Sequence, residues 1–245
     1  MPEQDGFPGL QEPFTPKPIH LHLILDVSPS MRTRWDQTLS GLNEYFDSLR
    51  QDQKTNDQPY VVTVTTFSAD SHTPFEGVEL DTIPTFTEKN LSPHGWGTAL
   101  YDACGPTIEK INTDDPVLVM IVTDGEENSS RKWDETRLSK LMEERSKLGN
   151  YTYAYLGVAK EAWGNAAKMG AAVTRSASNM SAQDYGAGTY HDLAGQTVMY
   201  SRSMRNNSVL KSAGQNVSMS VDNFFDQTEP EEVQANGEAT NSTGK

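Results

Sequence analysis

The sequence predicts an α/β protein with a doubly wound, mostly parallel sheet, one antiparallel edge strand and helices on both faces, as in Rossmann-like folds. Short apolar runs alternate along the chain with segments whose apolar residues recur at helical spacing. Two of these runs, 20–25 and 117–122, have the composition of strands covered on both faces. Such alternation is typical of parallel sheets joined by helical crossovers.

The first part of the predicted domain contains three strands and one helix. Residues 20–25 form a short, mostly apolar run that predicts the first central strand. Residues 32–50 carry apolar side chains at steps of three and four, which places them on one face of a helix. The β-branched run 60–67 predicts a second strand, and the alternating residues 73–80 predict an antiparallel edge strand.

The middle of the domain continues the alternation. Residues 98–111 place apolar side chains on one helical face, although Pro106 should perturb the middle of this helix. Residues 117–122 are the most apolar run in the chain and predict the second central strand. An amphipathic helix is predicted over 134–148, and a strand over 151–156 follows it.

Three further elements complete the predicted domain. They are a short alanine-rich helix over 162–169, a brief strand over 171–174 and a final helix over 192–205. The domain is therefore expected to span 19–205.

The two ends of the chain differ in composition from this domain. Residues 1–18 contain five prolines, which prevent a helix and predict an extended leader. Residues 206–245 are rich in Ser, Asn, Gln, Gly and acidic side chains and poor in apolar ones, so we predict an acidic, disordered tail.

Charge limits the classes of partner. The formal net charge is -14 and the pI is near 4.7. A nucleic-acid-binding surface needs clustered Lys and Arg, which this composition does not favour. We therefore expect proteins or cations as partners, and no nucleic acid.

Cysteine usage and hydropathy indicate the compartment. Cys104 is the single cysteine, so an internal disulfide and a thiolate zinc cluster are both excluded. The first residues do not resemble a secretion signal, and no apolar run approaches the length of a membrane span. The expected location is the cytoplasm, with no membrane partner.

Oxygen-bearing side chains follow the ends of the predicted strands and begin a predicted helix. Ligands bind beyond the carboxyl ends of the strands in doubly wound sheets, so these side chains should share one edge. Hydroxyl and carboxylate oxygens are the ligands that a hard cation such as Mg²⁺ prefers. Helix capping and turn formation are the ordinary alternative role for the same residue types. The candidate metal-binding residues are Asp26, Ser28, Ser30, Thr98 and Asp124.

These motifs resemble a known family. The Asp-x-Ser-x-Ser at 26–30, the later Gly-Thr at 97–98 and the Thr-Asp-Gly at 123–125 are similar to the metal-ion-dependent adhesion site (MIDAS) of von Willebrand factor type A (vWA) domains, in an intracellular bacterial or phage-like form. Met31 also matches the common form of the motif. The resemblance covers 19–205.

The resemblance implies a ligand set and a function. It implies that the hydroxyls of Ser28, Ser30 and Thr98 bind the metal directly and that Asp26 and Asp124 act mostly through bound waters. The implied metal is Mg²⁺, with Mn²⁺ or Ca²⁺ as the other divalent choices. A cation so weakly neutralised attracts one further ligand, so we expect capture of an Asp or Glu offered by a protein partner.

Two other function classes stay open. One is a metal-dependent hydrolase of phosphoesters or acyl esters, built on Asp26, Ser28 or Ser30. The chain lacks the Gly-x-Ser-x-Gly elbow and a lysine-bearing phosphate loop, and we therefore expect no enzyme. The other is a structural or assembly component.

Several residues near the predicted site have an ordinary explanation. His94 is expected to be an exposed loop residue, and Trp96 either rims the site or packs beneath its loop. Asp102, one helical turn after Thr98, is expected to be an exposed helix acid, with contact to a metal-bound water as the alternative. Glu126 and Glu127 are expected to be solvated loop charges and not ligands. His20 and His22 share a strand face but lack a third metal ligand nearby. Cys104 is expected to be a small buried residue.

The acidic tail suggests one regulatory alternative. Asp222 or Asp226, which flank Phe224 and Phe225, would dock on the metal in cis and compete with the partner.

Overall fold

The computed structural model describes residues 16–125, 127–157, 173–174 and 187–212. The sheet order is β3-β2-β1-β4-β5-β6. All neighbouring strands pair in parallel except β2 and β3, which are antiparallel, so the predicted fold class is confirmed. The strands are β1 (Ile19–Asp26), β2 (Tyr60–Phe67), β3 (Ser71–Glu79), β4 (Val117–Thr123), β5 (Tyr151–Gly157) and β6 (Val173–Thr174).

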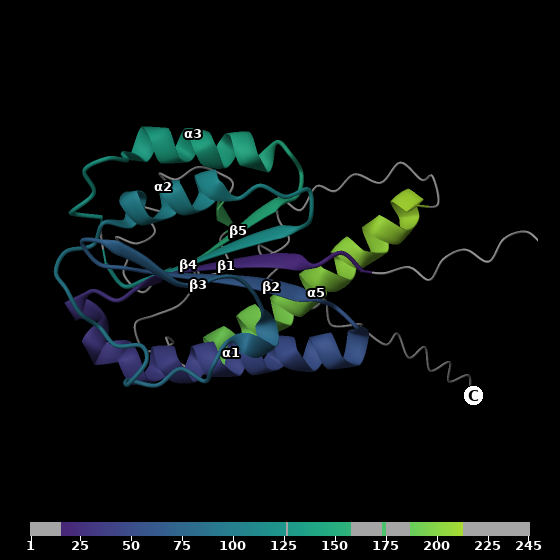
Figure 1. Ribbon diagram of the computed structural model, residues 1–245, viewed down its shortest axis with the longest axis horizontal. Coiled ribbons are helices and arrows are strands. Elements are labelled where there is room, and N and C mark those ends of the chain that lie inside the picture. Colours follow the sequence, from purple (N-terminus) through teal and green to yellow (C-terminus); the bar gives the residue numbers. More distant parts are fainter. Residues whose placement is uncertain (1–15, 126, 158–172, 175–186, 213–245) are drawn as a thin grey trace, which may run out of the picture.

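The helices form layers on both faces of this sheet. Helices α2 and α3 lie over one face, and α1 and α5 lie over the other (Figure 1). The helical elements are η1 (Pro29–Arg34), α1 (Trp35–Asn56), η2 (Leu80–Thr82), α2 (Leu100–Lys110), α3 (Glu135–Ser146) and α5 (Ala187–Ser212).

The predicted elements agree with the observed ones in type and order, and differ in some bounds. The helix predicted over 32–50 is preceded by the 3-10 turn η1 and runs to Asn56. The last helix is longer than predicted at both ends. The helix predicted over 162–169 lies outside the described residues, as do Glu126, residues 1–15 of the predicted leader and 213–245 of the predicted tail.

Local chemistry explains where α1 ends and how α2 continues. Asp57 has a left-handed φ of 54°, a conformation that stops a helix. Pro106 lies inside α2 without ending it. Cys104 and Ile108 on either side of this proline are fully buried, and their packing holds the helix across the lost backbone hydrogen bond.

Two hydrophobic cores lie on opposite faces of the sheet. On β4, Leu118, Met120 and Val122 pack toward α1 and α5. The alternate residues, including Val119 and Ile121, pack toward α2 and α3. Fully burying one such side chain contributes about 2 kcal/mol. The continuous burial of β4 confirms its place at the centre of the sheet.

Helix α5 is fixed against α1 by close packing and by buried hydrogen bonds. A Cβ atom added at Gly41 would lie 2.0 Å from the ring of Tyr190, so only glycine allows this approach. The hydroxyls of Tyr45 and Thr197 lie 3.1 Å apart in the same interface.

None of the helices in the described residues combines the length and the hydrophobicity of a membrane span.

Candidate metal centre

The first part of the candidate site is the turn that follows β1. Asp26 is the last residue of this strand and is fully buried. Its Oδ1 accepts a hydrogen bond from the backbone N–H of Ser28 at 2.7 Å. The turn then enters η1 at Pro29, a residue suited to the first position of a helical turn. The carboxylate and the Ser28 hydroxyl are therefore positioned by the backbone.

A chain of hydrogen bonds joins this turn to the end of β4. The hydroxyl oxygens of Ser28 and Ser30 lie 2.9 Å apart. The Ser30 hydroxyl donates to Asp124 Oδ1 at 2.8 Å, although the two residues are far apart in the sequence. The Asp124 side chain is only 2% exposed. The predicted convergence of these three side chains is therefore observed.

The two central strands are also joined directly. Thr123, the last residue of β4, donates its hydroxyl to Asp26 Oδ2 at 2.6 Å. The same Thr123 oxygen accepts from the backbone N–H of Gly125 at 3.2 Å. Thr123 therefore orients the Asp26 carboxylate and shapes the loop that carries Asp124.

Thr98 reaches the site from the loop before α2. It is buried, and its backbone N–H donates to Asn128 Oδ1 at 2.9 Å while its carbonyl accepts from the Asn128 N–H at 3.0 Å. A Cβ atom placed on Gly125 would lie 3.4 Å from Thr98 Oγ1 and 4.0 Å from Asp26 Oδ2. Gly125 therefore lies beside both of these oxygens, and all five predicted residues meet at one edge of the sheet.

The loop that carries Thr98 is held tightly on both sides. His94 donates its backbone N–H to the carbonyl of Val27 at 2.7 Å. Gly95 and Gly97 have left-handed φ values of 79° and 66°. A Cβ atom at Gly97 would approach Ser129 Oγ within 2.1 Å, so this position needs glycine.

Trp96 stands between these glycines and is 63% exposed. Of the two positions open from the sequence, it therefore occupies the rim. The exposed His94 ring accompanies it, and its Nδ1 lies 2.8 Å from the carbonyl of Ser92. The loop thus presents an indole to solvent beside the candidate site.

Glu127 has a structural role, which corrects the expectation of a solvated charge. Its Oε1 accepts from the backbone N–H groups of Ser129 and Ser130 at 2.8 and 2.7 Å. Its Oε2 accepts from the backbone N–H of Tyr101 at 3.0 Å, at the start of α2. Glu127 therefore fixes the loop after β4 against the first turn of α2, where a negative charge is favourable.

Asp102 also holds a loop and was likewise expected to be a solvated acid. Its carboxylate accepts from three successive backbone N–H groups, those of Arg131, Lys132 and Trp133, at 2.7 to 2.9 Å. Partial burial raises the pKa of this carboxyl, but the three backbone hydrogen bonds outweigh that effect and lower it. No local pattern marks these contacts, because they join segments far apart along the chain.

The electrostatics of the site are dominated by two buried carboxyl groups. Burial raises the pKa of Asp26; hydrogen bonds from Thr123 and Ser28 oppose this shift, and the nearby Asp124 carboxylate adds to it. Arg34 Nη1 lies 3.6 Å from Asp124 Oδ2 and is partly exposed. Among the described residues, this is the one cationic side chain in ion-pair distance of either acid.

The donor set fits a hard cation. Two carboxylates and three hydroxyls supply oxygen atoms, which suit Mg²⁺, Mn²⁺ or Ca²⁺. Within the described ranges, no group of three or more His, Cys, Asp or Glu is arranged to hold a metal ion. A metal at this edge therefore depends on the Ser and Thr hydroxyls as well as on the acids.

Comparison with known proteins identifies the fold. No protein-family model and no curated protein matches the chain. The structure is similar to proximal thread matrix protein 1 from the mussel byssus, with a TM-score of 0.55 and 14% identity over 76% of this chain and 47% of that one. It is also similar to a von Willebrand factor type A protein from Catenulispora acidiphila, with a TM-score of 0.52 and 14% identity over 75% of this chain and 43% of that one.

The mussel protein has also been solved with a zinc-occupied MIDAS motif, a structure that aligns with a TM-score of 0.45 and 16% identity over 65% of this chain and 41% of that one. The similarity to the Catenulispora acidiphila protein shows that the chain has a vWA-like fold. It spans less than half the length of these structures.

Proposed function

We propose that this chain is a metal-dependent protein-binding module. In this proposal Asp26, Ser28, Ser30, Thr98 and Asp124 hold one divalent cation, with Mg²⁺ as the native metal. The cation accepts an Asp or Glu side chain from a protein partner as a further ligand. The vWA-like fold supports the proposal, because the motifs of this chain at 26–30, 97–98 and 123–125 resemble the MIDAS of vWA domains.

The observation that carries the proposal is that two buried carboxyl groups lie close together and have few positive charges around them. Asp26 is fully buried and the Asp124 side chain nearly so, and the Asp124 carboxylate adds to the effect of burial in raising the pKa of Asp26. Buried carboxylates are costly unless a cation or hydrogen-bond donors compensate them. Of these two carboxyl groups, that of Asp124 lies within ion-pair distance of Arg34, at 3.6 Å, and that of Asp26 does not. A divalent cation among the hydroxyls supplies the missing positive charge.

The surroundings of the site suit a protein partner. A cation bound by neutral hydroxyls, with acids acting through water, keeps a strong attraction for an external carboxylate. Ser30 is exposed, so the site opens to solvent on this side. Trp96 lies on the rim and offers the kind of large, rigid apolar side chain that anchors interfaces. We propose that it contacts the partner beside the captured acid.

Binding explains the geometry better than hydrolysis. A nucleophilic serine needs a base within hydrogen-bond reach. In the described segments, the hydroxyls of Ser28 and Ser30 contact each other, and Ser30 donates to Asp124, a carboxylate that the proposal assigns to the metal. The His94 ring contacts a backbone carbonyl and neither serine hydroxyl in the bonds that the described residues form. The location that we propose is the cytoplasm, which suits the single, buried Cys104.

Direct titration of the metal tests the site. Calorimetry with MgCl₂, and electron paramagnetic resonance with MnCl₂, should show one site in the full chain. Asp26→Asn and Thr98→Ala should weaken metal binding by about tenfold or more. Asp114→Asn and Thr85→Ala, at exposed positions, are the matched controls and should bind as the parent does. Equal affinity in all five proteins would exclude the assigned ligands.

A peptide library tests partner capture. Peptides with one fixed Asp or Glu and random flanking residues are selected on the immobilised chain in MgCl₂ and eluted with EDTA. The proposal expects enrichment that depends on Mg²⁺ and disappears when the fixed acid is replaced by Asn or Gln. Enrichment that is the same in EDTA and in MgCl₂ would show that metal-mediated capture is not the activity.

A further inference from the structure

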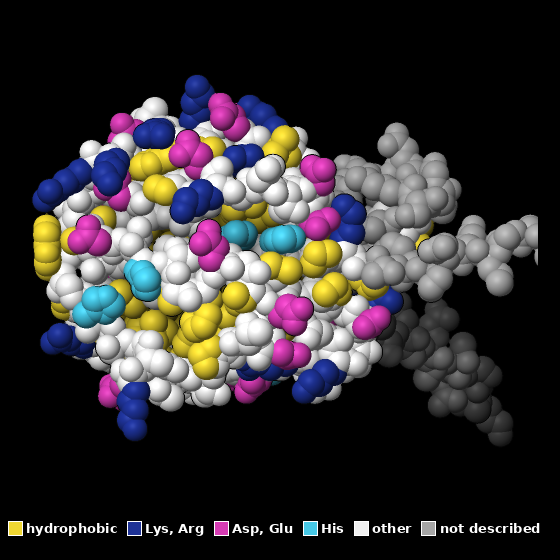
Figure 2. All heavy atoms as spheres, in the orientation of Figure 1, with side chains coloured by type: hydrophobic (Ala, Val, Ile, Leu, Met, Phe, Trp, Pro, Cys, Tyr) yellow, Lys and Arg dark blue, Asp and Glu magenta, His cyan; other side chains and the backbone are white. Residues whose placement is uncertain are grey.

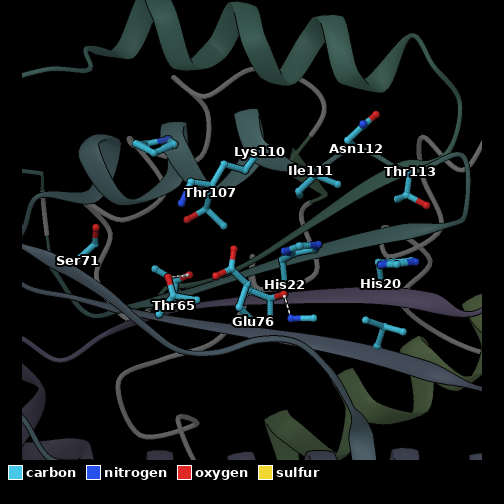
Figure 3. Close-up of a pocket in the computed structure, with 15 residues that line it drawn as sticks. His20, His22, Thr65, Ser71, Glu76, Thr107, Lys110, Ile111, Asn112 and Thr113 are labelled. Carbon is cyan, nitrogen blue, oxygen red and sulfur yellow. Dashed lines mark hydrogen bonds between the residues drawn. The ribbon is translucent and has the colours of Figure 1, made fainter.

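A hollow of about 370 Å³ lies between α2 and the face formed by β1, β2 and β3. This volume is within the range of small-molecule sites in proteins. Figure 3 shows His20 and His22 rising from β1 toward α2, Glu76 on the β3 side, and Thr107 and Lys110 reaching down from the helix. Histidine side chains are visible at the centre of this face of the molecule (Figure 2). The hollow is therefore open to solvent.

The floor of this hollow is the part of β1 that carries His20 and His22. Such polar side chains are unusual in a central strand. On β1, the side chains on the face toward α1 are apolar and buried: Ile19, Leu21, Leu23 and Leu25. On the other face, only Ile24 joins the apolar core, while His20 and His22 take the positions where a covered strand would carry apolar residues. This face is thus built to contact polar groups.

One polar atom of this floor is buried without a partner. His22 Nδ1 is buried and makes no hydrogen bond to any residue in the described part of the chain. Burial, and then the neighbouring His20, lower the pKa of His22 to about 4, so the ring is neutral at neutral pH. A neutral imidazole offers one donor and one acceptor. Buried polar groups in proteins are nearly always hydrogen-bonded. We therefore expect this ring to form a hydrogen bond with a group from outside the chain.

Most hydroxyls around the hollow are already engaged. The hydroxyl oxygens of Thr65 and Thr73 lie 3.1 Å apart. The Thr63 hydroxyl accepts from the backbone N–H of Gly77 at 3.0 Å, and the Thr107 hydroxyl donates to a backbone carbonyl in α2. They leave His22 as the polar group of the floor that lacks a partner.

Two side chains of opposite charge line opposite walls of the hollow. Lys110 belongs to α2 and Glu76 to β3, and both are exposed and line the hollow. Neither forms an ion pair with another residue that the structure describes. Asp115, which lies 3.5 Å from the lining residue His20, is also paired with Lys17 at 2.9 Å. The unpaired charges therefore sum to zero, which disfavours a phosphate or another polyanion.

We propose that this hollow binds a small zwitterion of the free amino acid class. Lys110 pairs with the carboxylate of the ligand, Glu76 accepts hydrogen bonds from its ammonium group, and the His22 imidazole hydrogen-bonds between them. Val61, Pro106 and Ile111 line the same hollow and favour an apolar ligand side chain.

The site is independent of the proposed metal centre. His20 and His22 lie in the first half of β1, whereas Asp26 ends it. His20 lies about 20 Å along the strand from Asp26, at the usual rise per strand residue. Ligand binding is therefore expected to be the same in MgCl₂ and in EDTA, and this separates the test from that of the metal centre.

Calorimetry and amide chemical shifts of the full chain provide the test. The twenty free L-amino acids are the probes, and each is compared with its N-acetyl and its carboxamide form. At least one apolar amino acid is expected to bind and to shift amides in 61–65 and 107–113. Blocking either charged group should weaken binding by about tenfold or more, because a charge-assisted hydrogen bond is lost. Inorganic phosphate and glucose should not bind.

Matched variants test the assigned residues. Lys110→Met and Glu76→Gln, at exposed positions that do not carry the fold, should each weaken binding by about tenfold or more. His22→Phe should abolish it, with circular dichroism as the check on folding. Lys89→Met and Glu88→Gln make the same chemical changes at exposed positions elsewhere and should bind as the parent does.

Three results would overturn the proposal. They are the failure of every free amino acid to bind, binding that tolerates both blocked forms equally, and binding that survives the Lys110 and Glu76 changes. Any of them leaves the hollow as a solvated polar face of the sheet.

Discussion

The hydroxyl of Thr123 donates to Asp26 Oδ2 at 2.6 Å, and this bond joins the carboxyl ends of the central strands β1 and β4. Both residues are fully buried. The bond therefore links the stability of the sheet to the orientation of a proposed metal-binding carboxylate.

Replacing Thr123 by Val is expected to affect both properties. The methyl group preserves the shape but leaves Asp26 Oδ2 buried without its donor, which costs about 1–3 kcal/mol of unfolding free energy. Mg²⁺ affinity should fall as the carboxylate loses its orientation, by about tenfold. Urea unfolding and metal titration measure the two effects. Thr123→Ser keeps the hydroxyl and should retain metal affinity; an equal loss in both variants would refute the role assigned to the hydrogen bond.

The pH dependence of stability should contain a contribution from His22. Burial and His20 lower the pKa of His22 from 6.5 to about 4 in the folded chain. The unfolded chain binds a proton between these two values and the folded chain does not, so stability falls as the pH decreases from 6.5 toward 4. The full effect is about 3 kcal/mol. The charged and titratable groups around this ring are His20, Glu76 and Lys110.

Urea unfolding at steps between pH 4.5 and 7.5 measures this contribution. His22→Gln should flatten the slope, whereas His72→Gln, at an exposed position, should leave it unchanged. A slope that persists in His22→Gln would assign the effect to another group.

Gly97 provides a test of the loop that carries Thr98. Alanine at its φ of 66° is strained by about 1 kcal/mol, and the added Cβ would also lie 2.1 Å from Ser129 Oγ. Gly97→Ala should therefore lower both unfolding free energy and Mg²⁺ affinity. Gly77 has a similar φ of 62° with nothing within 4 Å of an added Cβ, so Gly77→Ala should show the backbone strain alone. Unchanged metal affinity in Gly97→Ala would mean that Thr98 does not depend on this contact.

The order of strands and helices could be predicted from the sequence, because in the central elements the spacing of apolar residues matches the burial that the structure shows. The run 117–122 is apolar throughout, and β4 is buried throughout. The antiparallel edge was predictable from the alternation in 73–80, which is half exposed in β3. Helix ends were less predictable, because contacts with α5 and the left-handed Asp57 set the length of α1.

The positions of the five candidate ligands were predictable because each lies at or just after the end of a strand, or just before a helix. The residues that hold the loops of the site in place were not predictable. Glu127 and Asp102 accept backbone hydrogen bonds from segments about thirty residues away, and no local pattern marks such partners. Thr123 was visible only as the first residue of the Thr-Asp-Gly motif. The polar hollow was marked by His20 and His22, but Lys110 and Glu76 approach it through the tertiary fold alone.

Trp96→Ala should separate partner binding from metal binding. The indole is 63% exposed, so its loss should change unfolding free energy by less than about 0.5 kcal/mol. Affinity for Mg²⁺ should stay the same, because Trp96 supplies no ligand. Affinity for peptides selected in MgCl₂ should fall by about tenfold or more, as for an interface anchor. Identical peptide affinity in Trp96→Ala and the parent would remove this residue from the proposed interface.

Asp102→Asn should loosen the loop before α3. The Asp102 carboxylate accepts from the backbone N–H groups of Arg131, Lys132 and Trp133, and an amide offers one acceptor oxygen in place of two. The expected loss is about 1–2 kcal/mol. Because these bonds lower the pKa of the folded carboxyl, the stability that they give is complete above the unfolded pKa and is lost as the pH falls through the folded one. Urea unfolding at pH 7 and pH 3 should therefore show a difference between Asp102→Asn and the parent that shrinks at pH 3. The exposed Asp114→Asn should show no such difference, and a gap of equal size at both pH values would contradict the ionic origin of the effect.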